Sequence, residues 1–298
     1  TNCVLTSNSA AAYGGGAKGG TLYHCTLTGN SASGGGGAWS NTLHHCTLIG
    51  NSTTDSGGGG ALYSTLLHCT LAGNSTGEDG GGAYRSSLYH CTLTGNTAEE
   101  NGGGAGASTL TNCTLTGNTA GWGGGTSDCM LYNSLLTGNS AAPDFGGGGA
   151  IGGTLYNCTV TSNSAAISGG TLWTSLHNCI VYYNAAEFEP NFVGGELIHH
   201  TCTTPLPTNG TDNITNEPAF ANAPKGDYRL RYGSPCIDAG TNLSALITND
   251  LAGNPRPLDG NADGVAAFDM GAYDYNPQTG DSNGDGVPDG WCLRYGLR

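Results

Sequence analysis

The sequence predicts an all-β protein, a right-handed parallel β-helix (a solenoid) of about nine coils of 21–24 residues, followed by a small C-terminal β/loop module. Three observations support this prediction. A block of about 22 residues recurs between Asn2 and Cys202 and is centred on one cysteine. An asparagine follows the central position at a constant spacing of five residues. All variation in length falls between this asparagine and a run of glycines, as expected for stacked coils that each carry one loop.

The central cysteine and the Leu or Val two residues later share one face of a strand, because side chains alternate along a strand. Both are therefore predicted to point inward. The cysteine row is interrupted only by Ser134 and comprises Cys3, Cys25, Cys46, Cys69, Cys91, Cys113, Cys158, Cys179 and Cys202. Buried free thiols and disulfides between neighbouring coils are both compatible with this row. No Cys-x-x-Cys sequence exists, so redox catalysis is not indicated.

A second leucine lies three residues before the cysteine, as Leu22 does before Cys25. An odd offset cannot place both side chains on one face of a flat strand, so a bend must lie between them. The residue before the cysteine is His or Asn, two types that tolerate left-handed backbone angles. We expect His24, His45, His68 and His90 to form corners rather than a metal site, because the adjacent cysteines face the other way.

The asparagines that follow the central position are predicted to form an internal amide ladder that hydrogen-bonds the turns. This row comprises Asn8, Asn30, Asn51, Asn74, Asn96, Asn118, Asn139, Asn163 and Asn184. The loops after it hold most of the acidic residues of the repeats, which are expected to keep one edge of the solenoid soluble or to make calcium-mediated or subunit contacts: Asp55, Glu78, Asp79, Glu99, Glu100 and Asp144.

Threonines flank the inward leucine, as Thr26 and Thr28 do, and are predicted to point outward. A flat T-x-T array resembles the ice-binding face of some β-solenoid antifreeze proteins. Threonine is also simply a good surface residue for a strand. The array is interrupted by Ile49, Ala72, Leu135 and Tyr182.

The repeats carry a family resemblance in two motifs. Leu27 to Asn30 reads Leu-Thr-Gly-Asn and Gly102 to Ala105 reads Gly-Gly-Gly-Ala. Together they resemble the repeats of chlamydial polymorphic outer-membrane proteins and related autotransporter passengers. The chain differs by having Leu where those repeats have Phe, and by its cysteine row. The resemblance implies a β-helix and leaves the biological role open.

The pattern stops near Thr203, and prolines from Pro205 to Pro224 mark a linker. The segment that runs from Asp227-Tyr228 through Ser234-Pro235-Cys236-Ile237-Asp238 to Gly271-Ala272-Tyr273 resembles the choice-of-anchor module that closes many secreted bacterial β-helix proteins. This resemblance implies secretion. We therefore divide the chain into a β-helix (1–203), a cap or anchor-associated module (204–275) and a calcium-loop tail (276–298).

Two acidic loops follow the pattern D-x-N-x-D-G, in which alternating oxygen ligands precede a glycine that permits a sharp turn. The first contains Asp259, Asn261 and Asp263; the second contains Asp281, Asn283 and Asp285, with Asp289 beyond. The second loop resembles the calcium loops of thrombospondin type 3 and dockerin repeats. Both are candidate Ca²⁺ sites, and solvated turns are the alternative.

The charge of the chain excludes two classes of partner. Its formal net charge is −14, with only eight Lys plus Arg, so no basic surface exists for nucleic acid or for anionic membranes. No apolar run is long enough to span a membrane. Because twelve cysteines are unusual for a cytosolic protein, we expect an extracellular or cell-surface location, with the chain trimmed from a longer exported precursor.

These features favour a non-catalytic structural protein, a surface adhesin or fibre subunit whose open β-helix ends associate into a head-to-tail homopolymer. The alternative is a protein that binds or cleaves polysaccharides, with surface glycans as partners. Cleavage is disfavoured because the solenoid offers only Lys18 and Arg85 as basic residues for a lyase, and its acids lie on loop tips. An ice-binding solenoid is a minor alternative.

Overall fold

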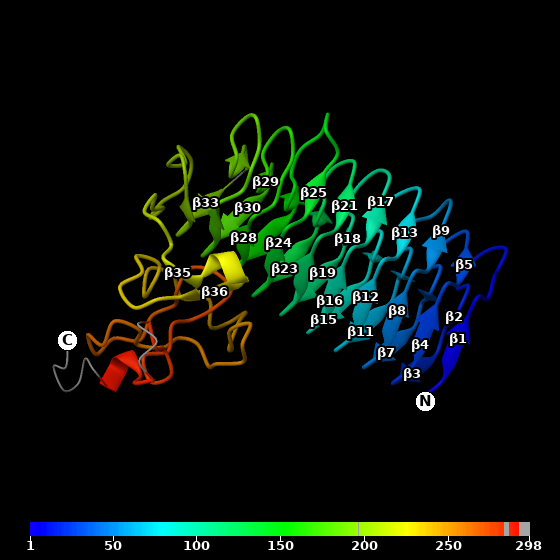
Figure 1. Ribbon diagram of the computed structural model, residues 1–298, viewed down its shortest axis with the longest axis horizontal. Helices are drawn as coiled ribbons and strands as arrows, with labels where there is room; N and C mark the ends of the chain where they lie inside the picture. The colour runs from blue at the N-terminus through cyan, green and yellow to red at the C-terminus, as the bar shows by residue number, and fades with distance from the viewer. Residues whose placement is uncertain (196, 283–285, 292–298) are drawn as a thin grey trace.

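The computed structural model describes residues 1–195, 197–282 and 286–291, and it is a right-handed parallel β-helix of about nine coils with a C-terminal module beside its last coils (Figure 1). The predicted fold class is confirmed. Equivalent strands of successive coils pair in parallel and in register, as Leu71 does with Leu48 and Leu93. Each coil therefore contacts mainly its two neighbours, which is the general property of a solenoid.

Four parallel sheets run along the described part of the solenoid. The sheet that follows the central cysteine contains β1 (Val4–Thr6), β4 (Thr26–Thr28), β8 (Thr47–Ile49), β12 (Thr70–Ala72), β16 (Thr92–Thr94), β20 (Thr114–Thr116), β24 (Leu135–Thr137), β28 (Thr159–Thr161), β31 (Ile180–Tyr182) and β34 (Cys202–Thr203). A shorter sheet that follows the asparagine ladder contains β5 (Ser31–Ala32), β9 (Ser52–Thr53), β13 (Ser75–Thr76), β17 (Thr97–Ala98), β21 (Thr119–Ala120) and β25 (Ser140–Ala141).

The other two sheets complete each coil. The sheet that follows the glycine runs contains β2 (Ala17–Lys18), β6 (Ala38–Trp39), β10 (Ala61–Leu62), β14 (Ala83–Tyr84), β18 (Ala105–Gly106), β22 (Thr126–Ser127), β26 (Ala150–Ile151), β29 (Thr171–Leu172) and β32 (Phe192–Val193). The sheet that precedes the cysteine contains β3 (Thr21–Tyr23), β7 (Thr42–His44), β11 (Thr65–Leu67), β15 (Ser87–Tyr89), β19 (Thr109–Thr111), β23 (Met130–Tyr132), β27 (Thr154–Tyr156), β30 (Ser175–His177) and β33 (Ile198–His199).

The corners are single residues with left-handed backbone angles. In one coil they are Gly73 (φ 60°), Arg85 (φ 47°) and His90 (φ 52°). The residue before the central cysteine has a positive φ throughout, from Asn2 (φ 54°) to Asn178 (φ 53°), so the predicted bend is confirmed. Space around Gly73 is open, which means that its backbone angle, rather than crowding, favours glycine there.

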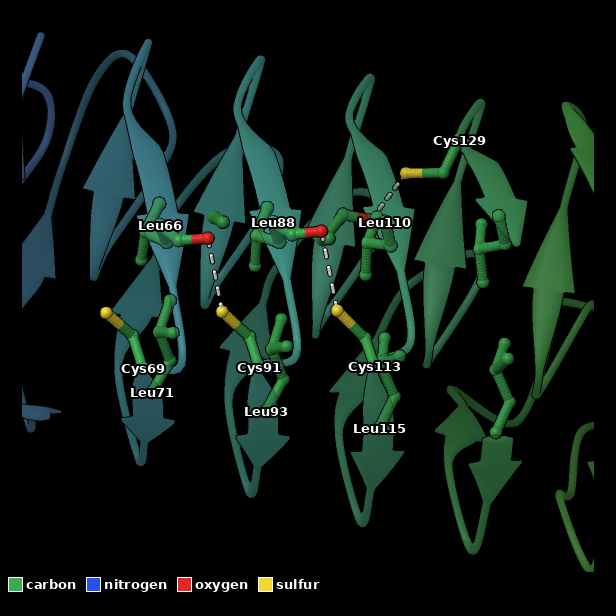
Figure 2. Packing of buried hydrophobic residues seen from close by; sticks show 14 of the residues in the cluster. Leu66, Cys69, Leu71, Leu88, Cys91, Leu93, Leu110, Cys113, Leu115 and Cys129 are labelled. Carbon is green, nitrogen blue, oxygen red and sulfur yellow. Dashed lines mark hydrogen bonds between the residues drawn. The ribbon is translucent and has the colours of Figure 1, made fainter. Parts of the chain in front are cut away.

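The core consists of columns of identical side chains. Leu66, Leu88 and Leu110 form one column, and the cysteines and the leucines after them form two more (Figure 2). The thiols are satisfied within the core: Cys91 Sγ donates to the carbonyl oxygens of Leu66 at 3.5 Å and Tyr89 at 3.4 Å. Buried apolar columns of this kind supply the main favourable free energy of folding.

At Ser134 the cysteine row is broken because, in this coil, a serine and a cysteine have exchanged places between two neighbouring columns. Ser64, Ser86 and Ser108 form a second polar column at the corner before β11, β15 and β19. The next member of that column is Cys129, whose Sγ accepts a hydrogen bond from Ser108 N at 3.4 Å. Ser134 in turn accepts from Cys113 N at 3.1 Å. Figure 2 shows Cys129 apart from the cysteine row.

Cys202 is not a member of the cysteine column, which corrects the sequence prediction. Its register partner is Ile180, and Thr203 pairs with Val181. The cause is the position of the cysteine in the repeat: Cys202 follows Ile198 by four residues, whereas each column cysteine follows its leucine by three, so Thr201 takes the column position in the last coil. Since side chains alternate along a strand, this shift turns Cys202 to the outside of the solenoid.

The asparagine ladder is present over its whole predicted length. In each coil the main-chain N–H and the side-chain Nδ2 both donate to Oδ1 of the next asparagine; for Asn74 and Asn96 these distances are 3.0 and 2.9 Å. The ladder continues beyond Asn184, whose Nδ2 donates to Asn191 Oδ1 at 3.3 Å. The spacing did not predict Asn191 as a member.

The chain after β34 crosses the end of the last coil. Thr203 N donates to Ile214 O at 2.9 Å and Ile214 N to Thr201 O at 3.0 Å. Asn213 Nδ2 donates to Ile198 O at 2.7 Å. Residues 205–216 thus pair with the edge that a following coil would otherwise use. This covered edge disfavours the head-to-tail homopolymer, which would need it open.

The C-terminal module lies against the outer face of β24, β28, β31 and β34 and contains β35 (Phe220–Asn222), a 3₁₀ turn η1 (Ala223–Lys225) and β36 (Asp227–Leu230) (Figure 1). The outward row that holds threonines in the first coils becomes apolar here. Leu135, Ile180 and Cys202 bury their side chains against residues of the module such as Phe220 and Met270. The interruption of the T-x-T array at Leu135 thus marks the docking site.

The corner residues change with this docking. Histidines occupy four corners of the first coils and Asn2 and Asn112 occupy two others, whereas Asn133, Asn157 and Asn178 lie under the module and bond to it. A buried arginine of the module adds a further link. Arg256, fully buried, pairs with Asp274 at 2.6 Å and donates to Asn133 Oδ1 at 2.7 Å. Both members of the ion pair belong to the module, so the pair positions the guanidinium of Arg256, and its bond to Asn133 connects the module to the solenoid.

Candidate functional site

A groove with a volume of about 580 Å³ crosses the side of the solenoid over β22 and β26. It is the hollow on the described surface of the coils that combines a large exposed aromatic ring with carboxylate and amide groups. Its lining residues are Asp79, Asn101, Ser127, Asp128, Ile151, Gly152, Gly153, Thr154, Trp173 and Ser175. We consider it the candidate functional site.

The groove arises where one column of corner residues is interrupted. The corner between the sheets of β2 and β3 carries Asp128 (φ 51°) and Trp173 (φ 52°), with Gly152 (φ 62°) between them. A Cβ atom at Gly152 would collide with Asp128 Oδ1. The missing side chain therefore leaves an opening between the carboxylate and the indole, and a side chain at this place would have to displace the carboxylate of Asp128.

Trp173 forms the aromatic wall of the groove. Its side chain lies over Gly194, where an added Cβ would come within 2.7 Å of Cδ1. The residue is 61% exposed, the largest exposed fraction among the tryptophans that the structure describes. A tryptophan ring combines a large apolar face with one N–H donor, so such a ring on a rigid corner is a ready contact surface for a ligand.

The other wall comes from the loops that precede β14 and β18. Asn101 Nδ2 donates to Asp79 Oδ1 at 2.8 Å, which fixes both side chains at the edge of the groove. Ser127, the outward residue of β22, is small and nearly buried, so the space above it stays open. The walls present carboxylate and amide oxygens, which accept hydrogen bonds from hydroxyl groups.

No Lys, Arg or His is among these described lining residues, so the groove is acidic. Arg85 belongs to the same corner column, but its side chain points toward the preceding coil, where it donates to Tyr63 OH at 2.7 Å. The groove therefore favours neutral or cationic ligands and disfavours anionic ones.

The two predicted calcium loops are turns closed by their own carboxylates. Asp259 accepts hydrogen bonds from Asp263 N at 3.1 Å and Gly264 N at 3.0 Å, and Asn261 lies between them. In the second loop Asp281 accepts from Gly286 N at 2.8 Å. Asn283 and Asp285 lie outside the described residues.

Asp289, the last predicted ligand, is nearly buried and accepts a hydrogen bond from Tyr275 OH at 2.7 Å. Within the described ranges no group of three or more His, Cys, Asp or Glu side chains is arranged to hold a metal ion. Calcium at both loops stays a prediction.

The four corner histidines stack on consecutive coils, with ring centroids of His24 and His45 5.0 Å apart and those of His68 and His90 4.8 Å apart. Burial, and then the neighbouring His68, His24 and His44, lower the pKa of His45. The rings are parallel and share a face exposed to solvent. The lowered pKa favours the uncharged ring of His45.

The fold and the groove define the class of this chain as a parallel β-helix with a lateral polar groove. Among solved structures it is similar to pectate lyase Pel9A, with 10% sequence identity, a TM-score of 0.44, and coverage of 92% of this chain and 86% of that one. No family model matches the chain, and no curated protein does. The likeness concerns the shape of the solenoid alone. No helix of the described residues is long and apolar enough to cross a membrane.

Sequence reasoning found only part of this groove. Asp79 was assigned to the acidic loop edge, while Asp128 and Trp173 were not singled out. The sequence does contain one indication of the groove. Gly152-Gly153 occupies the two positions that hold a corner residue with a side chain and then a polar residue in the next coil, Trp173 and Thr174. The corner itself was not recognised, since its members share a backbone angle and not a residue type: Ser40, Tyr63, Arg85, Ala107, Asp128 and Trp173.

Proposed function

We propose that this protein is a non-catalytic extracellular adhesin whose solenoid binds a neutral glycan along the lateral groove. The observation that carries the proposal is the exposed ring of Trp173 beside the opening at Gly152. A pyranose ring has apolar C–H faces and a rim of hydroxyl groups. The indole can pack against the C–H face, and the oxygens of Asp79, Asp128 and Asn101 can accept hydrogen bonds from the hydroxyl groups.

The groove supports binding better than cleavage. A lyase needs a basic residue to remove a proton, and none of the described lining residues is Lys, Arg or His. A hydrolase needs two carboxyl groups on either side of the scissile bond, one of them acting as an acid. Here Asp79 accepts a hydrogen bond from Asn101, and Asp128 is an exposed corner residue. Neither carboxylate is held in the buried setting that tunes a catalytic acid.

The charge of the groove sets the ligand class. Two carboxylates and a chain of net charge −14 repel polyuronates and sulfated glycans. The charge of the groove is compatible with neutral polysaccharides and with polysaccharides that carry amino groups. The rod also keeps most of the groove in a fixed shape, since its lining residues other than Asp79 and Asn101 belong to, or lie next to, strands paired on both sides.

Affinity electrophoresis tests this proposal. The protein is run in gels that contain a neutral glucan, a mannan, chitosan or polygalacturonate. We expect retardation by at least one of the first three and none by polygalacturonate. Trp173→Ala should abolish it, whereas Phe188→Ala, which removes an equally exposed ring outside the groove, should not.

Two results would overturn the proposal. One is equal retardation of the wild type and of Trp173→Ala, or none at all on the three gels. The other is the release of new reducing or unsaturated ends from any of these polysaccharides, which would make the protein an enzyme.

A further inference from the structure

Two cysteines meet where the C-terminal module touches the solenoid. Cys202 on β34 and Cys236 in the module are both 0% exposed and belong to one buried cluster with Ile180 and Met270. Both are free thiols in this structure, and the neighbouring thiol of Cys202, followed by burial, raises the pKa of Cys236. Cys202 reaches this place because of the one-residue shift that turns it outward from the solenoid.

The backbone around both residues is fixed. Cys202 N donates to Cys179 O at 2.9 Å, which holds it on the last coil. Cys236 N donates to Ser234 Oγ at 3.2 Å, and Cys236 O accepts from Met270 N at 3.0 Å. Each thiol is thus carried by a rigid element, and the two elements face each other across the docking surface.

The cysteines of the column are in a different situation. Most of their thiols donate to two carbonyl oxygens, as Cys91 does to Leu66 and Tyr89, whereas Cys202 Sγ donates to one, Asn216 O at 3.1 Å. A main-chain N–H also bonds to sulfur, as Cys25 N does to Cys46 Sγ at 3.4 Å. A bridge between neighbouring coils would break these bonds, and parallel strands in register impose an awkward torsion on it.

We propose that Cys202 and Cys236 form a disulfide bond that fastens the C-terminal module to the last coil of the solenoid. Two S–H bonds break and one S–S bond forms. The two protons and two electrons pass to a disulfide of the glutathione class, which leaves as two thiols. The exchange occurs before the module docks, because afterwards both sulfur atoms are out of reach of solvent.

The link would close the stretch of chain from Thr203 to Pro235, which includes the residues that cover the last coil and the hairpin β35–β36. Closing such a loop restricts the unfolded chain and so stabilises the folded arrangement. Once docked, the bond is protected from reduction by burial.

Peptide mapping tests the proposal on the whole chain. The protein is refolded in a buffer of reduced and oxidised glutathione, unfolded in the presence of an alkylating reagent, digested without reductant and analysed by mass spectrometry. We expect one linked peptide pair that contains Cys202 and Cys236, lighter by two hydrogens than the two free peptides together. The cysteines of the column should be alkylated.

Variants provide the control. Cys202→Ser should leave Cys236 alkylated and make the segment from 204 onward more than tenfold more sensitive to protease. Cys129→Ser removes another buried thiol but restores the residue type of its column, so it should keep the linked pair and the resistance. Alkylation of both Cys202 and Cys236 in the wild type, or linkage of Cys236 to Cys292 or to a column cysteine, would overturn the proposal.

Discussion

Asn178 and Thr241 exchange two hydrogen bonds across the boundary between the solenoid and the C-terminal module. Asn178 Nδ2 donates to Thr241 O at 2.8 Å, and Thr241 N donates to Asn178 Oδ1 at 2.9 Å. The same asparagine keeps a left-handed backbone angle at a corner of the β-helix (φ 53°). One residue therefore serves the turn of the coil and the docking of the module.

Replacing this asparagine tests its second role. Asn178→His keeps a residue type that occupies other corners of this chain, but it removes both bonds to Thr241 and leaves buried polar groups without partners. We expect the unfolding free energy of the module to fall by about 2 kcal/mol, measured by urea titration. The matched control is His45→Asn at an exposed corner, which should change stability by less than about 0.5 kcal/mol. Equal effects of the two changes would contradict the assigned role.

Replacing an asparagine of the amide ladder should lower the unfolding free energy more in the interior of the solenoid than at its exposed end. Asn96 accepts two hydrogen bonds from Asn74 and donates to Leu71 O and Asn118 Oδ1, all out of contact with water. Asn96→Ala should therefore cost about 3–5 kcal/mol of unfolding free energy. Asn8→Ala, at an exposed member of the same row, should cost less than about 1 kcal/mol, because water replaces the lost partner.

The histidine stack should make the first coils sensitive to acid. Burial and neighbouring histidines lower the pKa of His45 and His90. The unfolded chain then binds more protons than the folded one, so stability is full above the unfolded pKa of about 6.5 and decreases as pH falls below it.

The melting temperature should accordingly drop between about pH 7.5 and about pH 5. His68→Asn removes the middle ring and keeps a residue suited to the corner, and it should reduce this drop. An unchanged pH profile in that variant would show that the stack is not responsible.

Calcium should bind the acidic loops if the ligand pattern is correct. We expect terbium luminescence sensitised by nearby aromatic rings, displaced by calcium with a dissociation constant on the order of 10⁻⁴–10⁻³ M, as in extracellular sites. Asp281→Asn should remove one part of the signal and Asp263→Asn the other. Glu99→Gln, in a solenoid loop, is the control. No displaceable signal in the wild type would count against both sites.

Filling the groove should block glycan binding without harming the fold. Gly152→Asn adds a side chain beside Asp128 at a left-handed position that asparagine tolerates better than other residues. Retardation in affinity gels should be lost, while the melting temperature should fall by only a few degrees. Gly19→Asn, a left-handed glycine with open space around it, provides the control.

The repeats could be predicted in detail because each inward position recurs. The bend before Cys25, the columns of Leu and Cys, and the Asn ladder all follow from one spacing. The docking of the module on Asn133, Asn157 and Asn178 could not be predicted, since asparagine also occupies corners without a bond to the module, as at Asn2. The position of Cys202 was predictable in principle from its distance to Ile198. The groove was not, since it depends on a missing side chain.

In the first eight coils, variation in length is confined to the loops between the asparagine ladder and the glycine runs, as between β17 and β18 or β25 and β26. Neighbouring coils pair along their strands, and their loops add further bonds such as Glu99 N to Thr76 O. A foreign peptide spliced after Asp144, an exposed loop residue, would consequently be displayed at a defined spot without altering the coils around it. Because the coils repeat at a regular spacing, each one offers an independent place to attach an epitope or a tag.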